Sequence, residues 1–439
     1  MISSPALREY RLGAVLLLGA SCALVGLAVS VSPTLTISFA ILVVFVVCSA
    51  LSPKLAVALW LGVLCLIPTW FGVNQFGMFL EVAAIASMAS MPALVVHRRH
   101  FKFSSVDLMI AAAIGLAGLA VIFADSQIVL FRDIVLLGGF PYLIARVLTP
   151  AVGSVWLYRV FSFAMVGLAT WAIFEYAFDF HPFQSFFPGS PTSFWSEILF
   201  RAGAARSEVT FGHPIALGGA IAMAIPLTLG SDFRPATKIA FLSVLGLGIL
   251  TTASRGPLLA ALMGVLLMLV TRGQGKQIRG RPVILLILGI LGFLFLLLLA
   301  PSLSTDSEAV VSAEGRSNLY STLLPTINVL GPGDNFSFDI TGAINSYGFT
   351  SIDSTFLQLG LAFGWLPVAI IIVGLALNAL TVVRGRSTPA GVALLAMLPV
   401  LLTVAPIGPL QPLLWFLAGV TVATNLELHK ADRTGLTTA

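Results

Sequence analysis

Charged residues are scarce in this sequence. They make up 9% of its 439 residues, against about 25% in soluble globular proteins. Hydrophobic residues reach 58%, and apolar runs of about 20 residues, long enough to cross a bilayer, recur from end to end. These proportions exclude an ordinary soluble domain. They predict an all-α protein, a polytopic transmembrane helical bundle.

Cysteines and metal-binding motifs are also few. Cys22, Cys48 and Cys65 all fall inside predicted spans, where they are typical of small buried residues. The sequence contains no HExxH, no pair of CxxC motifs, no Walker-type loop and no aspartate-rich magnesium cluster. We therefore expect no metal site, and any phosphate group has to be bound by arginine.

Internal repeats and dense basic tracts are missing as well. The lack of a repeat disfavours the paired halves that many transporters have. The net charge of +5 is distributed over successive loops, which is typical of a topology signal. We therefore expect no nucleic-acid partner.

The apolar runs form about 14 predicted spans, with boundaries uncertain by about 2–4 residues. All but five of the 23 lysines and arginines lie in or beside short loops of one face. Because positive charge marks the cytoplasmic side, both termini are expected in the cytoplasm. The first span is interpreted as a retained helix because its apolar run is longer than that of a signal peptide. The expected spans are 12–31, 34–51, 55–71, 78–96, 106–124, 133–149, 154–176, 213–230, 239–253, 256–271, 283–300, 354–383, 389–405 and 408–424.

Two extracytoplasmic loops are long, and they divide the chain. Loops of this length are usually functional or disordered. The predicted organisation is a set of N-terminal transmembrane helices (1–176), a first loop (177–212), transmembrane helices (213–300), a second large loop (301–353), and C-terminal transmembrane helices with a cytoplasmic tail (354–439).

Five arginines lie on the face where positive charge is unusual: Arg132, Arg201, Arg206, Arg255 and Arg316. A planar guanidinium that binds phosphate with two hydrogen bonds is one reason to keep arginine there. A structural salt bridge or an interfacial position is the other. Both explanations stay open for Arg132 and Arg201, whereas the local motifs favour phosphate binding for the other three.

The first two motifs precede helices. Pro214 suits the first turn of a helix, which Thr210 or His213 could cap, so Arg206 is expected beside a helix N-terminus that attracts anions. An ordinary capped helix start fits the same residues. Arg255 lies in a tight Ser-Arg-Gly hairpin between two apolar spans, where its charge needs either a carboxylate partner or a ligand.

The third motif occupies the second large loop. Arg316 begins an amphipathic stretch, 316–329, whose apolar side is expected on the membrane surface. Asp353 stands at the mouth of a long span, as a helix N-cap, as a catalytic base, or as both. Glu81, at the outer end of the fourth span, is expected to form a salt bridge with one of the outer arginines.

Together these motifs resemble the superfamily of O-antigen ligases and Wzy-type polymerases, which are bacterial membrane glycosyltransferases. The resemblance covers about residues 200–370, and the N-terminal half matches only in its hydrophobic layout. The matching elements are Arg206 before Thr210-Phe211-Gly212-His213-Pro214, the hairpin Ser254-Arg255-Gly256, the pairs Gly315-Arg316 and Gly331-Pro332-Gly333, and the helix start Asp353-Ser354-Thr355-Phe356-Leu357-Gln358 with Gly364.

The resemblance implies a GT-C-like enzyme of the bacterial inner membrane that needs no metal and no cofactor. It transfers a glycan from undecaprenyl diphosphate to a hydroxyl of a glycan or lipid acceptor. Membrane lipids, a flippase and a chain-length regulator are the implied partners. Arg206, Arg255 and Arg316 are expected to bind the diphosphate, the last two together with Asp353 as catalytic residues, and His213, Arg201 and Glu81 to assist.

Ligases typically have histidine at the helix start where this chain has Asp353, which favours a polymerase. An O-antigen ligase is the first alternative. A transporter or flippase for an anionic or lipid-linked substrate is the second.

Overall fold

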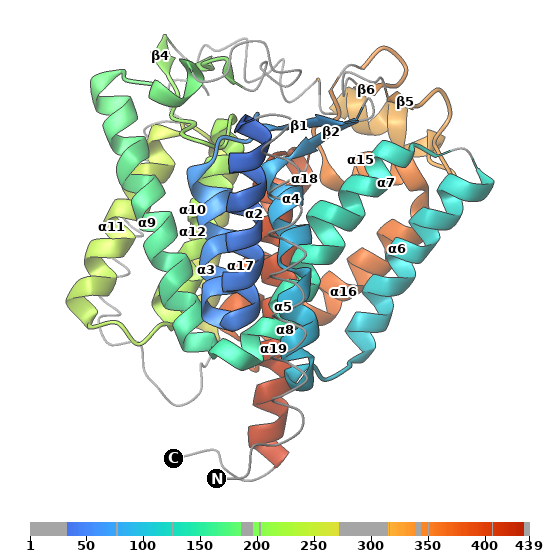
Figure 1. Cartoon of the computed structure of the whole chain (residues 1–439). Coiled ribbons are helices and arrows are strands. Elements are labelled where there is room, and N and C mark those ends of the chain that lie inside the picture. The colour runs from blue at the N-terminus through green and yellow to red at the C-terminus, as the bar shows by residue number, and fades with distance from the viewer. Residues whose placement is uncertain are drawn as a thin grey trace.

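The computed structural model of the protein describes residues 33–75, 78–124, 126–185, 196–201, 203–271, 315, 317–338, 344–349, 351–405 and 407–433. These residues form an upright bundle of helices with three short hairpins gathered at one end (Figure 1). We call this end the strand end. The opposite end, where the last helix extends beyond the others, is the tail end.

The helices cover most of the described residues. They are α2 (Pro33–Leu51), α3 (Pro53–Leu66), α4 (Val82–Ala89), α5 (Met91–His97), α6 (Ser105–Phe123), α7 (Ile128–Asp133), α8 (Phe140–Val152), α9 (Ser154–Phe178), α10 (Pro214–Gly230), α11 (Pro235–Thr251), α12 (Arg255–Val270), α15 (Thr355–Phe363), α16 (Trp365–Val383), α17 (Pro389–Ala396), α18 (Leu398–Thr403) and α19 (Leu410–Arg433). A π-helical segment, Ile134–Gly139, joins α7 to α8.

The strands form three antiparallel pairs of two. They are β1 (Gly72–Gln75) with β2 (Met78–Glu81), β3 (Phe200–Arg201) with β4 (Ala204–Ala205), and β5 (Ser337–Phe338) with β6 (Ile344–Asn345).

Four helical stretches in the described part are long and apolar enough to cross a membrane. They are Ser105–Phe123, Ile128–Val152, Ser154–Phe178 and Trp365–Val383. Spanning a hydrocarbon core of about 30 Å takes roughly 20 helical residues. These helices fit a membrane protein. Two predicted spans, 12–31 and 283–300, lie outside the described residues.

Three of the predicted spans are not continuous helices. The span 78–96 begins in β2 and continues as α4 and α5, with Pro92 at the start of α5. The span 389–405 divides into α17 and α18 beside Pro399, since proline cannot donate the helical hydrogen bond. The span 354–383 breaks at Gly364, where φ is +93°. Hydropathy alone does not detect such breaks.

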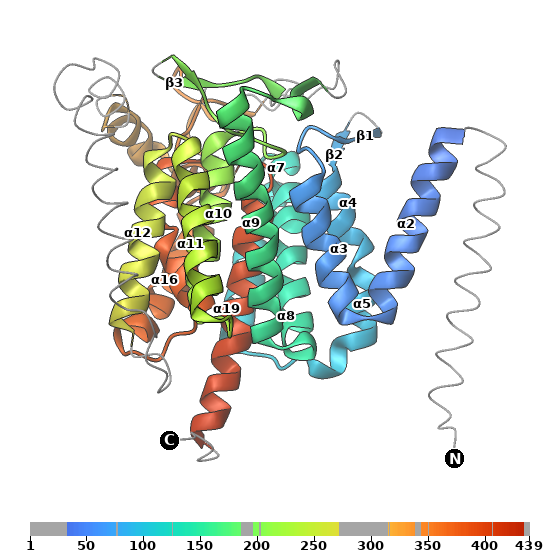
Figure 2. The ribbon, with the colours of Figure 1, turned by 90° about the vertical axis from the view of Figure 1, so that its left-hand side faces the viewer.

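Helix α10 forms the centre of the bundle and lies beside α9, α11 and α12 (Figure 2). All of its residues except Ile215 and Gly230 are buried. Its small residues let neighbouring helices approach closely, because a Cβ on Gly218 would lie 2.8 Å from the Cβ of Pro257. This tight packing fixes the starts of α10 and α12, which carry two of the sequence motifs.

Helices α6 and α16 pack against each other at the edge of the bundle (Figure 1). A buried ion pair holds the tail end of α6 against α8. The Arg146 guanidinium donates through Nε and Nη2 to the two carboxylate oxygens of Asp107, each at 2.7 Å, and the Tyr142 hydroxyl donates to Oδ1 at 2.6 Å. The two charged side chains are only 1% and 6% exposed.

Asp107→Ala is expected to destabilise the protein by about 3–5 kcal/mol, because it leaves the buried Arg146 without a counter-charge. Asp232→Ala is the matched control. It breaks an ion pair to Arg159 whose side chains are 45% and 51% exposed, so its cost is about 1 kcal/mol or less. Unfolding of the purified variants in detergent provides the measurement. Equal losses would contradict a stabilising role for the buried pair.

Candidate functional site

Arg206 lies at the strand end against the turn that joins α11 to α12. Its Nε donates to the carbonyl oxygen of Thr252 at 2.9 Å, and its Nη2 donates to the Ser254 hydroxyl at 2.7 Å. Burial and the nearby charge of Arg201 lower the pKa of the Arg206 guanidinium to about 10, against the raising effect of Glu208. The side chain stays protonated and binds the turn.

Arg201 binds the same turn from the hairpin β3–β4. Its Nη1 donates to the carbonyl oxygen of Ala253 at 2.9 Å. Ala253 has a φ of +47°, which is uncommon for a residue with a side chain. The last carbonyls of a helix carry partial negative charge and lack helical partners, so cations bind them well. Both arginines therefore stabilise the end of α11.

Arg255 begins α12 directly after this turn and is half-buried. Among the described residues, no carboxylate forms an ion pair with it. Ser254, the residue that precedes the helix, makes no side-chain capping bond to it. A guanidinium and an uncapped helix N-terminus thus occur together at this point, and both attract anions.

Two buried glutamates complete this region, and the sequence did not single them out. Glu175, near the end of α9, is 0% exposed and accepts hydrogen bonds from the backbone N–H groups of Glu208 and Val209 at 2.9 and 3.0 Å. Val209 has a φ of +51°, so Glu175 holds an unusual turn in place. The only sequence signal is an acid at the end of an apolar span.

Glu208 is also fully buried. Its Oε1 accepts from the backbone N–H of Leu199 at 2.9 Å. Burial and the charge of Glu175 raise the pKa of the Glu208 carboxyl to about 7, against the lowering effects of the Leu199 hydrogen bond and of Arg206. Near neutral pH this carboxyl is therefore partly protonated.

His213 is the residue that caps α10. Its Nδ1 accepts from the backbone N–H of Ile215 at 3.2 Å. Burial, together with the charge of Arg206, lowers the pKa of His213 to about 4. The imidazole is neutral at pH 7 and has a structural role. Thr210, the other expected cap, instead donates its hydroxyl to the carbonyl oxygen of Cys65 at 2.7 Å and joins this segment to α3.

Asp353 is exposed at the strand end, one residue before the helix cap. The expectation that it caps the helix is wrong, because the Ser354 hydroxyl accepts from the backbone N–H of Leu357 at 3.4 Å. The Asp353 carboxylate accepts from the Ser351 hydroxyl at 2.8 Å. Its remaining oxygen positions face solvent, so the carboxylate is accessible to a substrate.

The segment 400–404 contacts both the start of α12 and the start of α15. A Cβ on Gly256 would contact Val400 and Thr403 at 3.7 and 3.5 Å. On the other side, the Thr355 hydroxyl donates to the carbonyl oxygen of Val404 at 2.8 Å. The structure therefore brings the Ser-Arg-Gly hairpin and the start of α15 onto one short segment, although about 100 residues of chain separate them.

Arg316 lies outside the described residues. The residues that follow it, 317–323, are helical, with Leu319 and Leu323 buried on one side. This face packs in a protein core with Leu361 of α15. The stretch is amphipathic as predicted, but the expectation that its apolar side rests on the membrane surface is wrong, because α15 and α6 cover that side.

The Gly331-Pro332-Gly333 turn packs against the end of α15. The N–H groups of Gly331 and Gly333 donate to the carbonyl oxygens of Phe363 and Leu361 at 3.0 and 2.7 Å. A Cβ on Gly333 would lie 2.7 Å from Leu361 Cδ2. The turn therefore has a packing role.

Glu81 does not form the expected salt bridge within the described part of the chain. Arg132 pairs with Asp133 at 2.8 Å instead, and Glu81 Oε2 is buried with no hydrogen-bond partner among the described residues. The described residues also hold no group of three or more potential metal ligands.

Comparison with protein-family models, with curated proteins and with solved structures finds no match to this chain. The assignment of chemistry therefore depends on the motifs and on this geometry.

Glu175→Gln is expected to retain most of the stability, because an amide oxygen can still accept both N–H groups. Glu175→Ala leaves two buried donors unpaired, at about 1–3 kcal/mol each. Glu197→Ala, a change at an exposed position in the loop between α9 and β3, is the control. Denaturation in detergent compares the three, and similar results for Ala and Gln would exclude the holding role.

Glu208 makes the folded state less stable as the pH rises from about 5 to 8. Its pKa is about 7 in the folded protein against 4.5 for an ordinary glutamate, so the stabilisation is complete below pH 4.5 and is lost as pH rises through 7. Glu208→Gln removes this loss. The variant should gain thermal stability relative to the parent between pH 5 and pH 8, and a constant difference would refute the assignment. His213 makes the folded state less stable as the pH falls below 6.5, because its pKa is lowered in the folded protein. This effect is the same in the parent and in Glu208→Gln, so it does not change their difference.

Proposed function

We propose that the protein is a metal-independent membrane glycosyltransferase. It transfers a glycan from a polyprenyl-diphosphate carrier to an acceptor hydroxyl at the outer face of a bacterial cytoplasmic membrane, as a polysaccharide polymerase with a GT-C-like arrangement of spans. The observation that carries the proposal is Arg255. It begins an uncapped helix, it has no carboxylate partner among the described residues, and Arg201 and Arg206 hold its turn rigidly.

The proposed reaction breaks the bond between the sugar C1 and the diphosphate oxygen. The acceptor oxygen forms the new bond to C1, and its proton passes to the Asp353 carboxylate, which is exposed and accepts a hydrogen bond from Ser351. The leaving polyprenyl diphosphate gains negative charge. Arg255 and the start of α12 stabilise this charge, together with Arg316.

The structure supports a different role for Arg206 than for Arg255. Arg206 uses Nε and Nη2 on the turn, so its main contribution is to position the turn that carries Arg255. Arg201 acts in the same way. A transporter remains the alternative from another class, but the outer arginines of the described part gather at one end of the bundle and not along a path through it.

Arg255→Lys is expected to lower transfer by about 10²–10³-fold, because lysine keeps the charge but loses the two-pronged contact. Arg316→Lys is expected to lower transfer by a similar factor. Arg234→Lys, an exposed change before α11, should retain full activity. The assay uses protein in nanodiscs with a lipid-linked repeat unit. If both lysine variants insert normally and react at the parent rate, the phosphate-binding role is wrong.

The same assay separates the two transferases. Ladder formation without a lipid A-core acceptor indicates a polymerase, and single transfer that requires the acceptor indicates a ligase. A protein that moves the substrate across the membrane without transfer is a transporter.

Topology is tested independently of the reaction. The proposal places the strand end outside, because the basic loops lie at the tail end. In a background without Cys22, Cys48 and Cys65, Ser321→Cys should react with an impermeant reagent in intact cells, whereas Ser105→Cys should react only after permeabilisation. Both positions are exposed. The reverse pattern would invert the proposed orientation.

A further inference from the structure

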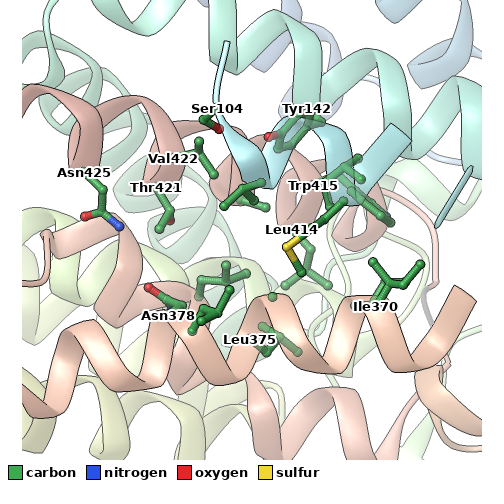
Figure 3. A pocket seen from close by; sticks show the side chains of 18 of the residues that line it. Ser104, Tyr142, Ile370, Leu375, Asn378, Leu414, Trp415, Thr421, Val422 and Asn425 are labelled. Carbon is green, nitrogen blue, oxygen red and sulfur yellow. The ribbon is translucent and has the colours of Figure 1, made fainter. Parts of the chain in front are cut away.

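A long cavity of about 330 Å³ separates α6 and α16 from α8 and α19 (Figure 3). Its rim at the strand end includes Thr355 and Gln411, and its rim at the tail end includes Ser104 and Asn425. Residues 411 and 425 lie on α19, so a rise of 1.5 Å per residue makes the cavity about 21 Å long. This exceeds the thickness of one leaflet, about 15 Å.

The middle of the cavity is apolar. Ile370, Leu375, Leu414 and Trp415 line it from the facing helices α16 and α19 (Figure 3). A space of this length, with apolar walls and between helices of spanning length, fits a hydrocarbon chain.

The tail end of the cavity is polar and contains unpartnered acceptors. Asn378 is 8% exposed, and its Nδ2 donates to the carbonyl oxygen of Gly391 at 2.8 Å, whereas its Oδ1 has no donor among the described residues. Asn425 Oδ1 is also buried, and the described part of the chain offers it no partner. The nearby hydroxyls of Thr381 and Thr421 donate to backbone carbonyls of their own helices. A ligand here has to bring its own O–H or N–H donors, because buried acceptors without donors are costly.

Exposed cations flank this polar end. Lys102 precedes the rim residue Ser104 by two positions. Arg384 and Arg386 follow Thr381, and the Arg386 N–H donates to the Thr381 carbonyl at 3.0 Å. Basic groups next to a pocket between spanning helices are suited to a lipid phosphate.

We propose that this cavity binds an anionic glycerophospholipid with a hydroxylated headgroup, such as phosphatidylglycerol. One acyl chain lies along the apolar walls, the headgroup hydroxyls donate to Asn378 and Asn425, and the phosphate lies near Arg384 and Arg386. A polyprenyl chain would fill the apolar part but would leave both amide oxygens unpaired. The bound chain reaches Thr355 and Phe356 at the start of α15. The proposal does not depend on the transfer reaction.

The experiment measures lipid binding by native mass spectrometry on delipidated, detergent-purified full-length protein. The probes are phosphatidylglycerol, phosphatidylethanolamine, phosphatidylcholine and a polyprenyl phosphate. We expect phosphatidylglycerol to bind most tightly, and we expect the preference to weaken as the salt concentration rises.

Gly374→Phe fills the cavity without a backbone clash, because Gly374 lines it and an added Cβ would meet nothing within 4 Å. Binding should fall roughly tenfold or more, since part of the chain is excluded. Gly115→Phe is the matched control. It lies on the adjacent α6, its Cβ also meets nothing within 4 Å, and it should bind as the parent does.

Asn425→Leu tests the polar end separately. It removes an acceptor that makes no hydrogen bond within the described protein, so the fold should persist while affinity for phosphatidylglycerol falls about 2–10-fold. Affinity for the polyprenyl phosphate should not fall. Three results would overturn the proposal: tighter binding of the polyprenyl phosphate, equal binding of all four lipids, or unchanged phosphatidylglycerol binding in both Gly374→Phe and Asn425→Leu.

Discussion

The strand end depends on one requirement, which is that the carbonyl groups at the end of α11 need hydrogen-bond donors. A helix leaves its last carbonyls without helical partners. Here the carbonyl of Thr251 accepts from the backbone N–H of Ser207, that of Thr252 from Arg206, and that of Ala253 from Arg201. One segment, 201–207, thus satisfies three successive carbonyls. These contacts hold the turn that precedes α12.

The same segment is held from its other side by a carboxylate. Glu175 of α9 accepts two backbone N–H groups from the next residues, Glu208 and Val209. The Ser207 hydroxyl also donates to the carbonyl oxygen of Ala172 in α9 at 2.7 Å. Arginine side chains therefore bind backbone carbonyls in this region, and a glutamate side chain binds backbone N–H groups. Arg255 differs from these residues, because no carboxylate of the described part of the chain forms an ion pair with it, whereas Arg132 pairs with Asp133.

The break between α15 and α16 decides which elements meet at the strand end. Gly364 separates α15 from α16, because its φ of +93° is not helical. A side chain cannot replace the glycine, since a Cβ there would lie 2.6 Å from the Cα of Leu330. The short α15 therefore contacts the end of α18, where the Thr355 hydroxyl donates to the carbonyl oxygen of Val404. This places the exposed Asp353 next to the segment that also contacts Gly256. The starts of α12 and α15 therefore both contact residues 400–404, and the cavity that we propose to bind lipid is lined in part by α15.

Hydropathy by itself determined the class of the protein, an all-α bundle of apolar helices, because a bilayer admits few other folds. Proline and glycine motifs located the starts of α10 and α12 at Pro214 and Arg255, since these residues act on the backbone locally. The partners of each charge depended on packing between distant segments. Only the tertiary structure revealed that Arg206 binds a turn 46 residues away, that Ser354 and not Asp353 caps α15, and that Glu175 and Glu208 are buried together. The contacts of Arg206, Glu175 and Glu208 join α9, α11 and the loop between α9 and α10, and no local pattern of residues encodes them.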